Sequence, residues 1–169
     1  MATAANSPIR HSPLAVTPFD RLLAAGAVAM AVVLALAVAR GHDDWARIPA
    51  VIWFHLATIA VAMVLTPVML LRRRGDRLHR RLGWVWAGAM FLTAIDTLFI
   101  RGINRGGFSI IHLLSIWTII QVPVIILAAR RHDAARHKSA VRGMVLGALL
   151  VAGFFTLPFG RLLGDWLFG

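Results

Sequence analysis

Four histidines in this 169-residue chain belong to two copies of one pattern, in which His, Pro, Asp and His follow one another in the same order. The members are His55, Pro67, Asp76 and His79 in the first copy, and His112, Pro123, Asp133 and His137 in the second. Self-similarity in a fixed order indicates an internal duplication. Imidazole is a common ligand of metal ions and of haem iron, so the duplication predicts cofactor binding by paired histidines.

The segments that carry these histidines are predicted to be membrane-spanning helices. Hydrophobic residues make up 59% of the chain, and its mean hydropathy of +0.76 is far above that of an ordinary soluble domain. Residues 1–18 are polar and predict a cytoplasmic tail ahead of a single membrane domain, 19–169. Apolar runs long enough to cross a bilayer predict five helices, at about 22–39, 49–71, 82–101, 108–129 and 140–159.

The distribution of arginine predicts the orientation of these helices. The stretch 72–81 holds six Arg, and the stretch 130–142 holds four Arg and Lys138. Positively charged loops remain in the cytoplasm, so the N-terminus is predicted to be cytoplasmic and the C-terminus periplasmic, in a bacterial inner membrane. The last four helices are then a four-helix up-down core of two repeated hairpins, and the first helix is expected to be peripheral.

This topology predicts which histidines pair. His55 and His112 lie near the outer ends of their helices, and His79 and His137 lie at the cytoplasmic starts of theirs. Alternate helices of a sequentially wound bundle are diagonal and about 11–14 Å apart. That separation is too wide for a shared small metal ion and suits two imidazoles on opposite faces of a haem iron. We expect one outer and one inner haem, roughly 20–25 Å apart.

Structural explanations for some of these residues stay open at this point. A histidine beside Arg or Lys at a helix entrance is typical of an interfacial anchor, which applies to His79 and His137. A histidine inside a span is costly and is by default a functional candidate, which favours His55 and His112. Four glycines offer either flat surfaces for a porphyrin or close helix packing, namely Gly83, Gly88, Gly143 and Gly147.

Asp96 lies at a depth similar to that of the outer histidines, and a buried carboxylate needs a partner. Its candidate partners are His55, His112, Thr93, Thr97, Arg101 and Arg105. Asp96 could orient an imidazole, complete a His-His-carboxylate metal site, accept a proton near a quinol, or bond locally to a threonine. Arg101 and Arg105 are well placed to bind haem propionates, and a solvated loop is the alternative for Arg105.

Several other functions lack the residues that they need. The net charge of +11 rests on 17 Arg and one Lys that flank apolar segments, which indicates membrane topology and not nucleic-acid binding. The absence of cysteine excludes disulfides, thiolate-bound zinc and Cys-held iron–sulfur clusters. Glutamate is also absent, and no nucleophile elbow, phosphate loop or paired-carboxylate site is present, so hydrolysis and phosphoryl transfer are unsupported.

The stretch from about Phe54 to Gly169 resembles a bacterial family of predicted membrane proteins, the domain of unknown function 2306. The resemblance rests on His55 and on the stretches 74–83, 106–109, 111–115 and 136–138. The order of histidines is also similar to that of the di-haem cytochrome b561 class, and His79 to Gly83 resembles its His-x-x-x-Gly turn. This second resemblance implies two b haems that carry electrons across a membrane. The five predicted spans depart from the six of that class.

The sequence therefore predicts a b-type cytochrome, or a haem-binding subunit of a respiratory assembly, as an electron-transfer component. The expected cofactor is haem b, one or two per chain, and quinone is a further candidate ligand. One alternative is an assembly or metal-handling factor for a respiratory oxidase, with His55, His112 and Asp96 as ligands. Another is a non-catalytic accessory subunit whose histidines only make interhelical hydrogen bonds. The predicted partners are the lipid bilayer and other membrane subunits or a redox partner.

Overall fold

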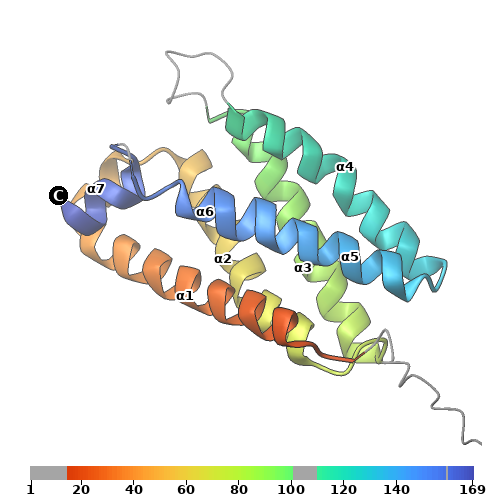
Figure 1. Cartoon of the computed structure of the whole chain (residues 1–169). Coiled ribbons are helices and arrows are strands. Elements are labelled where there is room, and N and C mark those ends of the chain that lie inside the picture. The colour runs from red at the N-terminus through yellow and green to blue at the C-terminus, as the bar shows by residue number, and fades with distance from the viewer. Residues whose placement is uncertain (1–14, 101–109, 159) are drawn as a thin grey trace, which may run out of the picture.

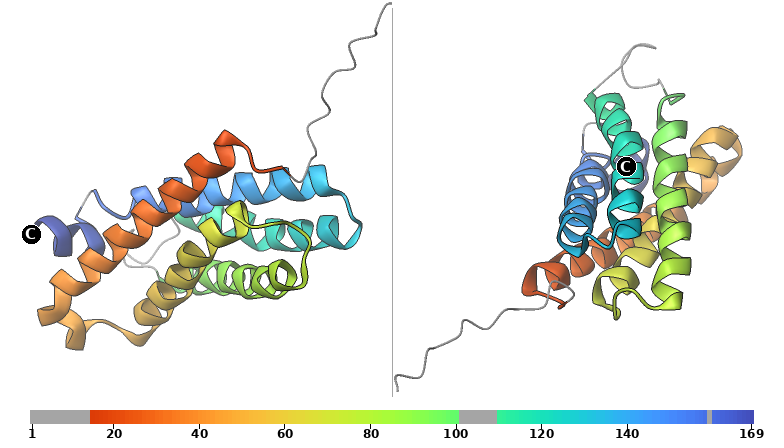
Figure 2. Two further views of the ribbon diagram at one scale, coloured as in Figure 1. Left: turned by 90° about the horizontal axis from the view of Figure 1, so that it is seen from below. Right: turned by 90° about the vertical axis from the view of Figure 1, so that its right-hand side faces the viewer.

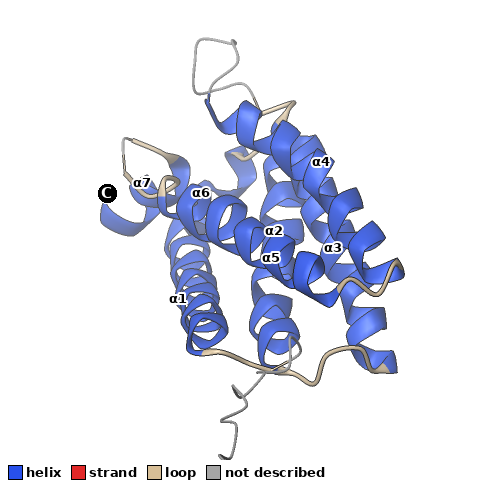
Figure 3. Ribbon diagram, turned by 45° about the vertical axis from the view of Figure 1, so that its right-hand side comes forward, coloured by secondary structure: helices blue, strands red, loops and turns tan. Residues whose placement is uncertain are grey.

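The computed structural model describes residues 15–100, 110–158 and 160–169, and within these ranges the chain is helical with no strand (Figure 3). The long helices are α1 (Pro18–Arg40), α2 (Ala50–Leu71), α3 (Arg77–Thr97), α4 (Ile110–Arg130) and α5 (Ala134–Met144). The shorter elements are the 3₁₀-helix η1 (Gly41–Arg47), the π-helical η2 (Val145–Val151), α6 (Ala152–Phe154) and α7 (Leu162–Phe168). The prediction of an all-α protein is confirmed.

Two helices begin earlier than the hydropathy predicted, because aspartate caps their first turns. Asp76 accepts a hydrogen bond from the backbone N–H of His79, and Asp133 accepts one from Arg136. An aspartate at this position satisfies an N–H that has no partner within the helix. α3 therefore starts at Arg77 and not at 82, and α5 starts at Ala134 and not at 140. The two capping aspartates are equivalent members of the repeated pattern.

The long helices alternate in direction, and each packs against the next in chain order (Figure 1). α5, η2 and α6 form one continuous helical stretch, which packs back on α1 through η2. α3 packs against both α2 and α4. The predicted peripheral position of the first helix is wrong. α1 packs along α2 and η2 and buries Leu23, Ala27 and Leu34 in the core (Figure 2).

One end of the bundle carries a tryptophan cluster, here called the tryptophan end. The ring of Trp53 lies 5.4 Å from that of Trp45 and 6.5 Å from that of Trp166 of α7. Gly41 permits this docking, because a Cβ there would lie 2.1 Å from the Trp166 ring. Arg40 also donates to the carbonyl of Leu167 at 2.6 Å. α7 is therefore attached to the end of α1.

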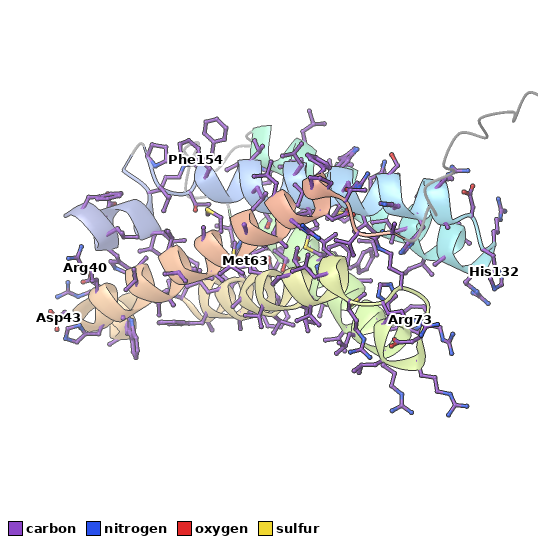
Figure 4. All side chains as sticks on the ribbon, turned by 60° about the horizontal axis from the view of Figure 1, so that its bottom comes forward. Arg40, Asp43, Met63, Arg73, His132 and Phe154 are labelled. Atoms are coloured by element: carbon purple, nitrogen blue, oxygen red, sulfur yellow. The ribbon has the colours of Figure 1, made fainter. Side chains whose placement is uncertain are left out.

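The opposite end, here called the basic end, holds the start of α1, the α2–α3 loop and the α4–α5 turn. Figure 4 shows Arg73 and His132 there, with Arg40 and Asp43 at the other end and Met63 between them. Gly75 has a φ of +86° in the α2–α3 loop, a conformation that glycine adopts at little cost. Between the two ends, Trp86 of α3 is buried and donates to Thr66 of α2 at 2.9 Å.

A fully buried carboxylate joins three elements at the basic end. Asp20 lies 2.8 Å from Arg142 of α5 and 3.0 Å from Arg74 of the α2–α3 loop, and Lys138 is 3.7 Å away. Asp20 also forms a capping box with Thr17 at the start of α1. This arrangement, called the Asp20 hub below, fixes the start of α1 against α5.

Within the described part of the chain, three helical stretches are long and apolar enough to cross a membrane. They are residues Pro18–Arg47, Ala50–Leu71 and Ile111–Arg130. Their outward faces expose large apolar side chains such as Val32, Val64 and Ile120. Exposed apolar surface of this extent is typical of contact with lipid, so the chain is membrane-associated.

Candidate functional site

A histidine and an aspartate on neighbouring helices form the centre of the candidate site. Nδ1 of His55 on α2 lies 2.7 Å from Oδ1 of Asp96 on α3. The Asp96 side chain is 7% exposed and the His55 side chain 25% exposed, so the pair is largely shielded from solvent. Hydrogen bonds of this length to a carboxylate are charge-assisted and strong. With Nδ1 occupied by Asp96, Nε2 of His55 is the atom available to a ligand.

Three threonines, Thr58, Thr93 and Thr97, form a ladder of hydrogen bonds that begins at this pair. Thr97 lies 3.3 Å from Nδ1 of His55 and donates to the carbonyl of Thr93 at 2.6 Å. Thr93 in turn donates to the hydroxyl of Thr58 at 2.7 Å, and Thr58 donates back to the carbonyl of His55 at 3.0 Å. These bonds connect α2 to α3 at two successive levels. They hold the His55 ring against rotation.

Of the partners considered for Asp96, the one that its side chain contacts in the structure is His55. Thr93 and Thr97 direct their hydroxyls elsewhere in the ladder. The second oxygen of Asp96, Oδ2, is buried and has no hydrogen-bond partner among the described residues. A buried carboxylate oxygen without a donor is costly, which marks this position as a place where a proton, water or ligand group would bind. Arg101 and Arg105 lie outside the described residues.

The second outer histidine, His112, occupies the corresponding level of α4. It is 2% exposed and lies in the first turn of its helix, as Asp96 lies in the last turn of α3. His55 is on α2 and His112 is on α4, and both of these helices pack on α3, which carries Asp96. The three residues therefore share the tryptophan end of the bundle. Among the described residues, no three or more His, Cys, Asp or Glu side chains are gathered closely enough to hold a metal ion.

The inner histidines are close enough to influence each other. Burial lowers the pKa of His79, and His137 lowers it further whenever its own ring is protonated. Nδ1 of His79 is buried and has no hydrogen-bond partner in the described ranges. His79 is three residues after its capping aspartate and His137 is four after its own, so their positions differ by about 100° around the helix axis. The repeat is therefore not exact at the inner level.

His137 is oriented much as His55 is. Its Nδ1 lies 3.0 Å from the carbonyl oxygen of Ile125 on α4, an acceptor that fixes the proton on Nδ1. Nε2 is then the unprotonated nitrogen of the neutral ring. Histidines that bind metals usually donate their other N–H to a carboxylate or a backbone carbonyl. His55 and His137, one from each predicted pair, both have this arrangement.

The four glycines considered as porphyrin surfaces divide into two types. A Cβ on Gly83 would lie 3.4 Å from Met69, and one on Gly147 would lie 3.9 Å from Trp117, so these two face neighbouring helices. Gly88 and Gly143 are exposed, and a Cβ on either would meet no described atom within 4 Å. Gly88 and Gly143 therefore do not line the bundle interior. Of the four glycines, Gly83 and Gly147 are therefore the two that remain candidates for contact with a porphyrin.

Sequence reasoning missed two features of these sites. Thr58 was not singled out, although a threonine three residues after a histidine on a helix lies on nearly the same face. The Asp20 hub was also missed, because its partners Arg74, Lys138 and Arg142 are far away in the sequence. An aspartate three residues after Thr17 was the available signal for the capping box.

The chain matches no protein-family model, no curated protein and no solved structure. The resemblance to the family of domain of unknown function 2306 therefore rests on the sequence motifs alone. The geometry of the histidine sites is then the basis for a functional proposal.

Proposed function

We propose that this chain is a membrane-embedded b-type cytochrome or a haem-binding subunit of a respiratory assembly. The observation that carries the proposal is the 2.7 Å contact between Nδ1 of His55 and Oδ1 of Asp96. A carboxylate that fixes an imidazole inside an apolar helix bundle is the usual support for a histidine that ligates a metal through Nε2. A histidine at this depth is costly unless it has such a role.

The donor set fits haem better than it fits a small metal ion. His55 and His137 each have Nδ1 engaged, and His112 and His79 are the opposite members of the two pairs. Two histidines from opposite sides are sufficient for haem iron, whereas a small-metal site needs three or four ligands that are already gathered. Bound haem would supply one-electron chemistry. For that reason we do not favour the metal-handling alternative.

The residues of this chain would set the properties of such a centre. Asp96 and the Ile125 carbonyl would increase the basicity of their imidazoles, and the buried surroundings would shield the site from water. Oδ2 of Asp96, which accepts no hydrogen bond from a described residue, could hold a proton at the outer site, as quinol oxidation would need. Arg101 and Arg105 are proposed to bind propionates.

The proposal places five helical segments across the inner membrane, with the basic end in the cytoplasm. α3 and the α5–η2–α6 stretch add to the three most apolar segments, because they also expose large apolar residues, such as Leu92 and Val151. The α2–α3 loop and the α4–α5 turn carry the arginines, in accordance with the positive-inside rule. The N-terminus is then cytoplasmic and the C-terminus periplasmic. Along α3, His79 and Asp96 are about 25 Å apart at 1.5 Å per residue.

The test is a reduced-minus-oxidised absorption spectrum of detergent-purified protein with paired substitutions. The double variant His55→Ala and His112→Ala is expected to lose the outer haem, and the pair His79→Ala and His137→Ala the inner one. His42→Ala is the matched control, because His42 is an exposed histidine outside both pairs. An unchanged b-type band in both double variants would contradict the proposal.

A second candidate is an accessory subunit in which the histidines only join helices. It is favoured by the same two hydrogen bonds, since His55 connects α2 to α3 and His137 connects α5 to α4. In that case His55→Gln and His137→Gln would lower the thermal stability of a chain that contains no haem. Loss of a membrane complex on deletion of the gene for this chain, with no cofactor in the isolated chain, would distinguish this function from the first.

A further inference from the structure

A groove of about 570 Å³ opens at the basic end, beside the start of α1. Its lining residues come from α1, α5 and η2 and include Phe19, Lys138, Ser139, Arg142, Gly143 and Leu146. Two of them are cationic, one carries a hydroxyl group, and the others are apolar or have no side chain. The start of α1 lies beside α5 in this region, where Arg142 of α5 donates to Asp20 of α1 (Figure 2).

The polar side of the groove has more positive than negative charge. Three cations, Arg74, Lys138 and Arg142, contact the single carboxylate of Asp20. Burial, and then the positive charge of Arg74, lower the pKa of Lys138. Arg142 uses Nε on Asp20 and Nη2 on Thr17, which leaves Nη1 for another acceptor. A phosphate oxygen at this position would offset the surplus charge.

The other side of the groove suits an acyl chain. Phe19 is 41% exposed and Leu146 is 44% exposed, although both are large and apolar. The guanidinium of Arg142 lies 5.4 Å from the centre of the Phe19 ring, so the cationic and apolar parts adjoin. The groove lies where an apolar span, Pro18–Arg47, meets a basic loop region. The positive charge of the groove is therefore complementary to an anionic lipid headgroup. Its apolar side is at the depth along the helix where the glycerol and the first acyl carbons of that lipid would lie.

We infer that this groove binds the phosphate of an anionic phospholipid, with Ser139 and Arg142 on the phosphate, with the positive charge of Lys138 beside it, and with Phe19 and Leu146 against the acyl chain. Basic pockets between membrane helices on the cytoplasmic side bind such headgroups. Bound lipid would attach α1 to α5 beside the Asp20 hub. This inference does not depend on haem binding, because none of the four histidines lines the groove.

The experiment uses the full-length protein in phosphatidylcholine nanodiscs to which phosphatidylglycerol is added. Thermal unfolding reports stabilisation, and native mass spectrometry reports the lipid retained by each chain. Phosphatidylglycerol is expected to raise the unfolding temperature, and added phosphatidylcholine is not. Glycerol 3-phosphate and inorganic phosphate are the soluble probes in parallel samples.

Two variants remove different parts of the site. Lys138→Gln removes one positive charge, and the apparent affinity for phosphatidylglycerol should fall about fivefold. Gly143→Leu places an apolar side chain in the groove, and binding should be lost while the fold persists, since a Cβ there meets no described atom within 4 Å. Arg130→Gln is the matched charge control, because Arg130 is exposed on α4 away from the groove, and it should change the affinity less than about twofold.

Three results would overturn the inference. The first is an equal response to phosphatidylglycerol and phosphatidylcholine. The second is retention of the phosphatidylglycerol effect in folded Gly143→Leu protein. The third is full competition by glycerol 3-phosphate or inorganic phosphate, which would assign the groove to a soluble phosphate compound and not to lipid.

Discussion

Nδ1 of His55 on α2 and Oδ1 of Asp96 on α3 are 2.7 Å apart inside an apolar helix bundle. The contact joins two helices and at the same time fixes which nitrogen of the imidazole is available to a ligand. Hydrogen bonds through Thr58, Thr93 and Thr97 continue from the pair towards the middle of the bundle. The pair is thus oriented by residues that lie up to about one helical turn further into the bundle.

Asp96→Asn tests the importance of this orientation. The substitution keeps the size of the side chain but removes its charge, so the His55 ring loses its strongest acceptor. Haem retention at the outer site is expected to fall about 10–100-fold, as for other substitutions behind a metal-ligating histidine. Haem per chain after dilution measures the effect, and Asp43→Asn on the exposed η1 helix is the control. Equal haem retention in both variants would contradict the role given to Asp96.

The Asp20 hub should dominate the stability of the basic end. Asp20→Asn leaves Arg74, Lys138 and Arg142 close together without their carboxylate, and removing one partner of a buried ion pair costs about 3–5 kcal/mol. Chemical unfolding in detergent measures the loss. Asp44→Asn breaks only the exposed pair with Arg47 and should cost at most about 1 kcal/mol. Similar losses in the two variants would show that the hub is not a stabilising contact.

Two glycine substitutions of the same kind should have opposite effects. A Cβ at Gly164 of α7 would lie 1.8 Å from the carbonyl oxygen of Leu157, and this backbone overlap cannot be relieved by a rotamer change. Gly164→Ala should therefore detach α7 and lower the unfolding temperature. Gly88→Ala in α3 meets no described atom and should stabilise the chain by about 0.5–1 kcal/mol. Thermal unfolding followed by tryptophan fluorescence compares the two, and a stable Gly164→Ala variant would contradict the docked position of α7.

In the haem-free chain, stability at the basic end should depend on pH through His79. Burial and the charge of His137 lower its pKa in the folded chain, with Arg74 and Arg72 acting in the same direction and Asp76 in the opposite one. The neutral form is therefore favoured by folding, and the unfolded chain binds more protons as the pH approaches 6.5, the ordinary pKa of a histidine side chain. The contribution of His79 to stability is complete above that value and decreases as the pH falls through it.

Unfolding midpoints between about pH 7.5 and about pH 5.5 measure this dependence. His79→Gln should make the midpoint less sensitive to pH over that range. The exposed residue His42 provides the control, because His42→Gln removes an imidazole that is not buried. An equal loss of sensitivity in both variants would show that His79 is not the group responsible.

The helices followed from the sequence because they depend on local patterns. Apolar runs of sufficient length predicted α1, α2 and α4 to within a few residues, and Arg-rich loops predicted the alternation of direction. The caps at Asp76 and Asp133 were visible in the repeat but were not interpreted as helix starts. α3 and α5 were therefore predicted to begin too late.

Features that depend on the rotation of one helix against another could not be obtained in this way. The choice of His55 as the partner of Asp96, and the burial of Trp86 against Thr66, are set by how α2 packs on α3. The position of α1 inside the bundle depends on Leu23, Ala27 and Leu34, which look no different in sequence from lipid-facing residues. In a membrane protein both faces of a helix are apolar, so hydropathy alone does not separate them.

The most direct test of the proposed function is the amount of haem bound per chain in wild-type protein purified after expression with sufficient haem. A dithionite-reduced-minus-oxidised spectrum identifies the haem type, and pyridine haemochrome analysis gives the quantity. The expected result is a b-type spectrum with two haems per chain, or one if only the outer pair is occupied. A folded, well-expressed sample without haem would contradict the proposed function and would leave the histidines as contacts between helices.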